Sequence, residues 1–218
     1  MKQYRHVIWD WNGTLFDDAW LCVDIMNCLL QKRQLPLLDA AAYEQVFTFP
    51  VQDYYTACGF NFVHESYAEV AAEFVSLYDR RRFACALQPA ARHVLATLTQ
   101  RDITQSVLSA YEQSRLEEMI AFTQLGGTFS HIIGLSDYYA ASKVELGRNF
   151  VRELPCDPAD VVFIGDTVHD AETAEAMGVD CLLIPCGHYT KERLLTANAH
   201  VVDSLVDVLT QKKTQSVL

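Results

Sequence analysis

The sequence predicts an α/β fold, a Rossmann-like, doubly wound parallel sheet that carries an inserted α-helical domain. From about residue 85 onward, short apolar runs alternate with helical patterns, which is typical of a parallel sheet covered by helices. An earlier apolar run, residues 7–9, stands apart from the others, and only helical patterns lie between. We therefore expect residues 1–16 and 85–218 to form the core, and residues 17–84 to form a helical cap.

The first strand and the helical block can be read from their spacing. Residues 7–9 are apolar and short, as in a buried strand. Leu21, Ile25 and Leu29 then recur every fourth residue, which predicts an amphipathic helix that ends before Pro36. Further helices are expected over residues 39–47, 51–57 and 64–82.

The remaining elements complete the alternating pattern. Residues 161–164 are all apolar between Asp160 and Gly165, which indicates a fully buried strand. Pro89 fits the first turn of a helix, where its missing N–H costs nothing. Strands are expected over residues 103–108, 131–134, 161–164, 181–184 and 201–202. Helices are expected over residues 89–100, 112–122, 142–152 and 172–177, and one more closes the chain.

The composition and net charge of the chain exclude some classes of binding partner. The chain has 218 residues, half of them apolar, and a formal net charge of −11. That charge argues against nonspecific nucleic-acid binding and against anionic membrane surfaces, and no run approaches the ~20 apolar residues of a membrane span. The seven cysteines include no CxxC pair, and the N-terminus lacks a signal-peptide pattern. We expect a cytoplasmic protein with reduced thiols, either a monomer or a homodimer.

Polar residues follow the predicted strands where ligands bind in open parallel sheets, beyond the carboxyl ends. These residues are Asp10, Ser109, Ser136 with Asp137, and Asp166. Asp10 and Asp166 could supply the carboxylates that Mg²⁺ requires. Lys143, early in the next helix, could offset repulsion between a carboxylate nucleophile and a phosphate, and Ser109 could hydrogen-bond a phosphate oxygen.

Four short stretches resemble, in order and approximate spacing, the motifs of the haloacid dehalogenase-like hydrolase superfamily. They are DWNGT from Asp10, LSA around Ser109, SK ending at Lys143, and GDTVHD from Gly165. The long gap between the first two resembles the subclass with an α-helical cap. The later stretch MGVDCLLIPCGHYT resembles the phosphoglycolate phosphatase branch.

This resemblance implies roles for individual residues. Asp10 would be the nucleophile, and Asp10, Asn12 and Lys143 would form the catalytic set. Mg²⁺ would be held by Asp10, the backbone carbonyl of Asn12, and Asp166, with Asp170 nearby. A small phosphorylated substrate would be held through its phosphate by Asn12, Gly13, Thr14, Ser109, Ala110 and Lys143. The expected reaction is phosphate hydrolysis through an aspartyl-phosphate intermediate.

Asn12 departs from the pattern of the phosphatases that the chain resembles. They carry Asp at this position, which protonates the leaving group and then activates water, whereas an amide exchanges no proton. General acid–base catalysis is worth ~10²–10⁴-fold, so we expect slow turnover of alkyl phosphates and a preference for good leaving groups. The alternatives are a noncatalytic phospho-ligand sensor, a phosphonatase using Lys32, or a dehalogenase.

Other conspicuous residues have simpler explanations. We expect His169 to face away from the site or to pack in its loop, and His188 to be a loop residue that could touch substrate. The run of arginines at residues 80–82 suits a solvated helix end where cap meets core. An aromatic group is expected to form the cap's own core: Tyr43, Phe47, Phe49, Tyr54 and Tyr55.

Overall fold

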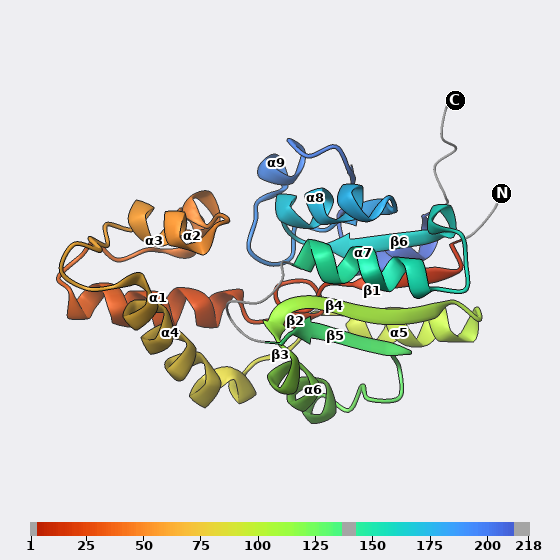
Figure 1. Ribbon diagram of the computed structural model, residues 1–218, viewed down its shortest axis with the longest axis horizontal. Coiled ribbons are helices and arrows are strands. Elements are labelled where there is room, and N and C mark those ends of the chain that lie inside the picture. Colours follow the sequence, from red (N-terminus) through yellow and green to blue (C-terminus); the bar gives the residue numbers. More distant parts are fainter. Residues whose placement is uncertain (1–3, 137–142, 212–218) are drawn as a thin grey trace.

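The structure is a computed structural model that describes residues 4–136 and 143–211. The predicted site residue Asp137 and the predicted helix start at Ser142 lie outside these residues. Within them, six parallel strands form the sheet of the core, and a helical region is inserted after the first strand (Figure 1). The α/β fold class predicted from the alternating pattern is therefore confirmed.

The sheet has the spatial order β5-β4-β1-β6-β7-β8. Its strands are β1 (His6–Trp9), β4 (Thr104–Glu112), β5 (His131–Leu135), β6 (Val161–Gly165), β7 (Asp180–Leu183) and β8 (His200–Val201). β1 lies at the centre, where Trp9 is in register with Val107 of β4 and Ile164 of β6. The carboxyl ends of these three strands therefore meet at one edge of the sheet.

Helices cover both faces of the sheet (Figure 1). They are α5 (Ala91–Gln100), α6 (Gln113–Phe122), α7 (Lys143–Glu153) and α8 (Val168–Met177). Successive side chains of β1 point to opposite faces, so Val7 and Trp9 pack in the apolar cluster that includes α5 and α6. Ile8 packs with α7 and α8 in a second cluster. A strand buried on both faces explains the uninterrupted apolar run in the sequence.

The inserted region consists of four helices and lies beside the core (Figure 1). These are α1 (Ala19–Lys32), α2 (Ala40–Val46), α3 (Val51–Ala57) and α4 (Tyr67–Arg81). Leu21, Ile25 and Leu29 are fully buried, as the fourfold spacing predicted. α4 begins with a capping box, in which Ser66 and Glu69 satisfy each other's backbone N–H groups. No helix among the described residues is long and apolar enough to cross a membrane.

A two-stranded ribbon joins the helical region to the core. β2 (Phe16–Asp17) pairs antiparallel with β3 (Ala86–Leu87), so the chain enters and leaves the region side by side. The sequence reasoning missed this ribbon because two residues are too few to show a strand period.

Two boundaries differ near the predicted site. β4 continues to Glu112 rather than ending at 108, so Ser109 and Ala110 lie within the strand, where its register with β5 shifts. α8 begins at Val168 rather than 172, because Thr167 and Asp170 form a capping box that starts the helix earlier.

Two helix predictions away from the site are also corrected. Pro89 is not in the first turn of a helix: Ala90 has a φ of +64°, and α5 begins only at Ala91. The closing helix is a short 3₁₀ segment, Leu205–Thr210, and the sequence reasoning missed the single turn α9 (Lys191–Leu194). Short segments of this kind have too few residues to show helical periodicity.

Candidate active site

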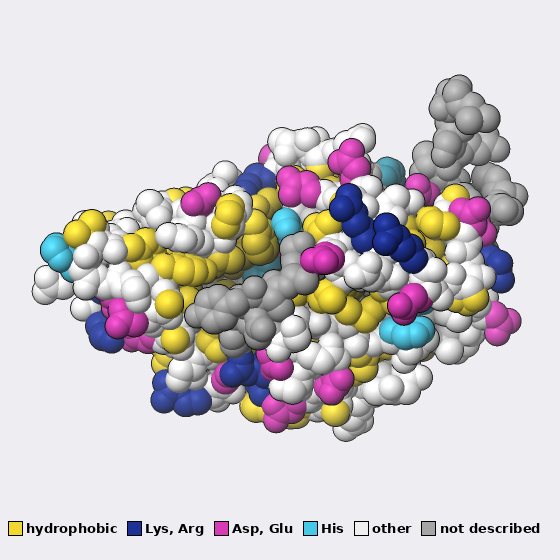
Figure 2. Space-filling model, viewed as in Figure 1, with side chains coloured by type: hydrophobic (Ala, Val, Ile, Leu, Met, Phe, Trp, Pro, Cys, Tyr) yellow, Lys and Arg dark blue, Asp and Glu magenta, His cyan; other side chains and the backbone are white. Residues whose placement is uncertain are grey.

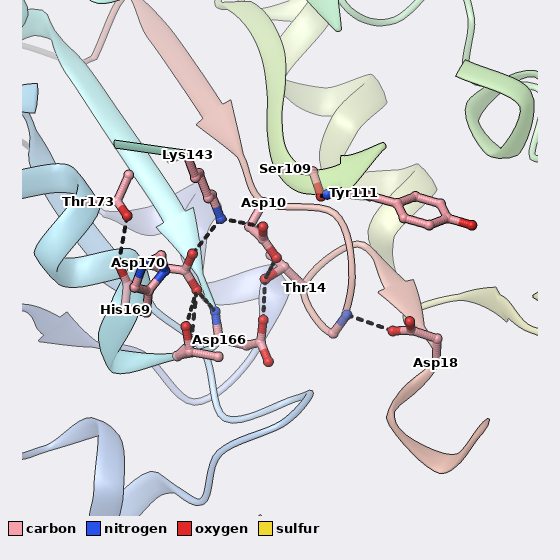
Figure 3. Close-up of polar contacts among 12 residues, drawn as sticks. Asp10, Thr14, Asp18, Ser109, Tyr111, Lys143, Asp166, His169, Asp170 and Thr173 are labelled. Atoms are coloured by element: carbon pink, nitrogen blue, oxygen red, sulfur yellow. Dashed lines mark hydrogen bonds and ion pairs between the residues drawn. The ribbon is translucent and has the colours of Figure 1, made fainter. Parts of the chain in front are cut away.

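The strand order changes direction at the centre of the sheet, between β1 and β6. The chain passes from β1 to β4 and β5 on one side, then returns to place β6, β7 and β8 on the other. In open α/β sheets, ligands bind in the crevice beyond such a switch point. Asp10 follows β1 and Asp166 follows β6, so two predicted carboxylates stand at this point (Figure 3).

Lys143, the first residue of α7, reaches between two carboxylates (Figure 3). Its Nζ lies 2.5 Å from Asp10 Oδ1 and 2.6 Å from Asp170 Oδ1, and all three residues are buried. An ammonium held between two buried carboxylates offsets part of their mutual repulsion. The structure thus brings together three residues that the sequence separates by up to 160 positions.

Thr14 links the two strand ends. Its Oγ1 donates to Asp166 Oδ1 at 2.8 Å and lies 3.3 Å from Asp10 Oδ2. The other oxygen of Asp166, Oδ2, accepts a hydrogen bond of 2.7 Å from the backbone N–H of His188. Asp166 is fully buried, and these two donors fix the orientation of its carboxylate.

Gly13 allows the loop after β1 to close on Asp166. It has a φ of +79°, a conformation that residues with side chains rarely adopt. A Cβ added there would lie 2.5 Å from Asp166 Oδ2 and 2.7 Å from His188 Cδ2, closer than nonbonded atoms approach. A glycine is therefore favoured at position 13 on steric grounds, because the loop backbone approaches the Asp166 carboxylate closely.

Asp170 lies in the first turn of α8 and accepts several hydrogen bonds. Its Oδ2 accepts from Thr167 Oγ1 at 2.8 Å, and from the backbone N–H groups of Thr167 and Asp166 at 3.0 and 3.2 Å. Its Oδ1 is occupied by Lys143 at 2.6 Å. A negative charge here also suits the positive end of the helix dipole. Asp170 therefore caps α8 and positions the Lys143 ammonium.

Burial changes how readily these groups ionise. It raises the pKa of Asp10 from 3.8 to about 7, although the Lys143 ammonium opposes the rise. Burial, together with the nearby Asp170 charge, also raises the pKa of Asp166 to about 7. Burial acts in the same direction on Asp170, but the ammonium outweighs it, and the pKa of Asp170 is lowered. For Lys143, the two adjacent carboxylates overcome burial and raise the pKa.

Among the described residues, three buried carboxylates face one ammonium, so this part of the site is short of positive charge. Asp10, Asp166 and Asp170 each offer an oxygen, and these three atoms lie within 4.8 Å of one another. A divalent cation would favour the ionised form of the carboxylates whose pKa burial raises. Hard oxygen ligands of this kind suit Mg²⁺ and similar ions. The residues present therefore fit a divalent metal ion.

Asn12 makes contacts that the sequence reasoning did not foresee. Its Nδ2 donates to Asp18 Oδ2 at 2.7 Å and to the Tyr78 hydroxyl at 2.8 Å. Asp18 also accepts from the backbone N–H of Gly13 at 2.9 Å (Figure 3) and from the Tyr78 hydroxyl at 2.6 Å. Asp18 directly precedes α1, and the fourfold spacing that predicts this helix does not point to a contact with Asn12. Nothing in the sequence links Tyr78, sixty residues away, to this loop.

Ser109 stands on β4, beside the end of β1 (Figure 3). Its buried Oγ accepts a 3.1 Å hydrogen bond from the backbone N–H of Tyr111, which leaves the hydroxyl hydrogen available for a ligand. Ala110 is exposed. The structure gives Ser109 a fixed position at the site through its hydrogen bond with the Tyr111 N–H.

The helical region contacts the core through aromatic side chains, and histidines lie among apolar groups at this junction (Figure 2). His188, which is buried, pairs its Nδ1 with the Tyr43 hydroxyl at 2.7 Å and packs on Phe47 at 4.9 Å between ring centroids. His169 stacks on Phe49 at 4.6 Å between ring centroids, so it contacts the helical region. The sequence reasoning placed these aromatic residues in the core of the cap and missed their contact with the two histidines.

Arg82 corrects another expectation. Rather than being solvated, it is buried, donates to the Tyr111 hydroxyl at 2.8 Å and forms an ion pair with Glu118 of α6. Arg81 does lie at the surface, where it pairs with Asp24 at 2.5 Å. Part of the arginine run therefore fastens the end of α4 to the core.

The family model for haloacid dehalogenase-like hydrolases matches residues 7–184. This span is most of the chain, and it includes the helical region, the carboxylate site and the sheet apart from β8 and the first residue of β1. The chain therefore belongs to the haloacid dehalogenase-like hydrolase family, which confirms the resemblance carried by the four motifs.

Solved structures with a similar fold have low sequence identity to this chain. A haloacid dehalogenase-like family hydrolase from Streptococcus pneumoniae has a TM-score of 0.83 and 19% identity, covering 96% of this chain and 99% of that chain. A predicted phosphoglycolate phosphatase from Haemophilus somnus 129pt has a TM-score of 0.79 and 14% identity, covering 96% and 98%. These likenesses establish the fold, including a helical region after the first strand.

Among curated proteins, the chain is similar to tyrosine-protein kinase PtkA of Mycobacterium tuberculosis. The two are 24% identical over 184 residues, which is 84% of this chain and 62% of that protein. The chain thus spans less than two thirds of the length of this curated relative.

Proposed function

We propose that the protein is a Mg²⁺-dependent phosphatase of small phosphorylated metabolites that works through an aspartyl-phosphate. This proposal rests mainly on one observation, the buried arrangement of Asp10, Lys143 and Asp166 at the switch point of the sheet. A carboxylate nucleophile and a phosphate repel each other, and Lys143, 2.5 Å from Asp10, is placed to offset that repulsion. The predicted phosphoglycolate phosphatases among the structural neighbours support this class of substrate.

The proposed metal ligands are Asp10, Asp166 and the backbone carbonyl of Asn12, with Asp170 beside them. Bound Mg²⁺ would supply positive charge at the phosphate oxygens. Asp170 would act chiefly by holding Lys143, since its oxygens accept the four hydrogen bonds described above. The proposed phosphate contacts are the Ser109 hydroxyl, the Lys143 ammonium and the loop formed by Asn12, Gly13 and Thr14, with Ala110 next to Ser109.

In the first proposed step, an oxygen of Asp10 attacks phosphorus, and the ester oxygen leaves with the bonding electrons. Asn12 has no proton to give, so a leaving group that is stable as an anion departs most readily. In the second step, water attacks phosphorus, releases phosphate and restores the Asp10 carboxylate, while its proton passes to solvent. Because no base at position 12 takes that proton, we expect this step to be slow.

We propose residues 17–84 as the cap of this site. Tyr43 and Phe47 lie against His188, whose backbone N–H holds Asp166, so the region contacts a residue that positions Asp166. Closure of such a region excludes water from the reacting groups. Its movement would be guided by the β2–β3 ribbon, the two-stranded link between the region and the core.

Asn12 favours one alternative, a sensor that binds a phosphorylated ligand without turning it over. The same set of charges would hold the ligand, and the absent acid would explain the lost activity. A phosphonatase is less well supported, because Lys32 is largely exposed and pairs with Glu73 at 2.8 Å. A dehalogenase would leave the acidic metal site without a role.

The test is p-nitrophenyl phosphate hydrolysis with and without Mg²⁺, comparing the wild type with Asp10→Asn and with the surface control Asp53→Asn. We expect Mg²⁺-dependent activity in the wild type and the control, and none in Asp10→Asn. Intact-mass spectrometry after mixing with acetyl phosphate should reveal one added phosphoryl group, absent in Asp10→Asn. Hydrolysis that survives in Asp10→Asn contradicts the nucleophile, and binding of vanadate without any turnover favours the sensor.

A further inference from the structure

The amide of Asn12 is held in one orientation by its surroundings. Its Nδ2 lies 2.7 Å from Asp18 Oδ2 and 2.8 Å from the Tyr78 hydroxyl oxygen, and these two oxygens are joined by a hydrogen bond of 2.6 Å, so the amide donates into one Asp18–Tyr78 pair. An ionised carboxylate only accepts hydrogen bonds, so the NH₂ group must face Asp18. With Nδ2 held there, Oδ1 keeps a fixed orientation, and it can only accept a hydrogen bond.

Asp18 is the centre of this arrangement. It is buried, and its carboxylate accepts from three donors: the Asn12 amide, the Gly13 backbone N–H at 2.9 Å and the Tyr78 hydroxyl at 2.6 Å. These donors come from the loop after β1 and from α4, while Asp18 itself precedes α1. One carboxylate thus ties the loop that carries Asp10 to two helices of the inserted region.

A carboxylate at position 12 does not fit this arrangement. It would face Asp18 Oδ2 at the 2.7 Å now spanned by the amide, with only the Tyr78 hydrogen between two negative charges in a buried place. Exchanging the two groups does fit. With Asp at 12 and Asn at 18, the amide of residue 18 would donate to residue 12, its oxygen would accept from Gly13 N–H, and Tyr78 would donate to residue 12.

We propose that Asn12 and Asp18 are a transposed amide–carboxylate pair, in which Asp18 and Tyr78 are positioning residues that hold Asn12 as a fixed acceptor beside Asp10. The consequence of this pair for catalysis rests on the proposed function. Asn12 accepts a hydrogen bond from attacking water and so orients it, but leaves the proton on it. Position 12 then lacks an acid because Asp18 carries the carboxylate of the pair. Asn12→Asp alone therefore does not restore a group that can move a proton.

The experiment compares Asn12→Asp, Asp18→Asn and the double variant with the wild type. Thermal unfolding measures whether the two positions are coupled. The ratio of kcat for ethyl phosphate to kcat for p-nitrophenyl phosphate, both with Mg²⁺, measures dependence on the leaving group. Asn27→Asp, alone and with Asp18→Asn, is the matched control: Asn27 of α1 also donates its amide, to the Leu38 carbonyl at 2.8 Å, but lies nine residues from Asp18.

We expect each single change to lower the Tm by about 3 °C or more, and the double variant to recover most of that loss. The Asn27 control should show additive losses. The double variant, but not Asn12→Asp alone, should raise the kcat ratio by about tenfold or more, because only the exchanged pair presents a carboxylate that can move a proton. Tyr78→Phe should lower kcat more than it changes KM.

Additive Tm losses in the double variant, or an Asn12→Asp protein as stable as the wild type, overturn the pairing. Recovered stability with an unchanged kcat ratio overturns the positioning role. If neither the wild type nor Asp10→Asn hydrolyses p-nitrophenyl phosphate, the proposed function fails, and the Tm comparison still decides the pairing because it needs no activity.

Discussion

The metal-free protein should lose stability as the pH rises towards neutrality. Burial raises the pKa of Asp10 from 3.8 to about 7 in the folded protein. Between these values, folded Asp10 keeps a proton that the unfolded chain has released, so the free energy of unfolding falls as the pH rises. At about 1.4 kcal/mol per pH unit, Asp10 alone accounts for about 4 kcal/mol.

The pKa shifts of the neighbouring acids determine the pH range over which this stability is lost. Asp166, whose pKa is also raised to about 7, acts in the same direction over the same pH range. Asp170, whose pKa is lowered, adds stability above its ordinary pKa, and this stability is lost only in more acidic solution. The decline should therefore lie between about pH 4 and pH 7, and Mg²⁺ should reverse it, by about 2.7 kcal/mol at 100 times its Kd.

Urea unfolding followed by circular dichroism, from about pH 5 to about pH 8, measures this loss with a chelator and with Mg²⁺. Asp10→Asn removes one of the two groups and should flatten the decline, whereas Asp53→Asn at the surface should leave it unchanged. A free energy of unfolding that stays level or rises over this range without metal would refute the reasoning. So would an identical profile with and without Mg²⁺.

Two further changes test single contacts by the same urea measurement. Lys143→Met leaves Asp10 and Asp170 facing each other without the ammonium, and should cost about 3–5 kcal/mol near pH 8 but less near pH 5, where the acids take up protons. An equal loss at both pH values would contradict this. Tyr43→Phe keeps the ring and removes only the hydroxyl that pairs with His188, so it should cost about 1 kcal/mol, and an unchanged stability would show that this contact does not fasten the helical region.

The polar residues at the strand ends could be predicted from sequence because their position follows from topology. Apolar runs locate the strands, parallel strands end at one edge, and so Asp10 and Asp166 had to lie near each other. The same logic applied to Ser109, although β4 runs past it to Glu112. Lys143 was harder, since only its motif, and not its helical position, distinguished it from a solvated lysine.

The contacts around Asn12 could not be predicted in the same way. Tyr78 and Asp18 meet because α4 packs on α1, and the geometry of that packing leaves no periodic trace in the sequence. Arg82 was assigned to solvent because it stands in a run of three arginines, yet its burial depends on Tyr111 and Glu118 of another segment. Charge patterns identify polar faces, but only tertiary structure shows which charge is enclosed.

The ribbon formed by β2 and β3 makes the helical region separable from the sheet. Its two ends leave the core on neighbouring strands, about 4.8 Å apart, a gap that a tight turn spans. The whole block could therefore be exchanged for that of a relative, or shortened to a hairpin, without moving any strand that carries Asp10 or Asp166. Any such exchange would also remove Asp18 and Tyr78, so the contacts that hold Asn12 would have to be rebuilt with the new block.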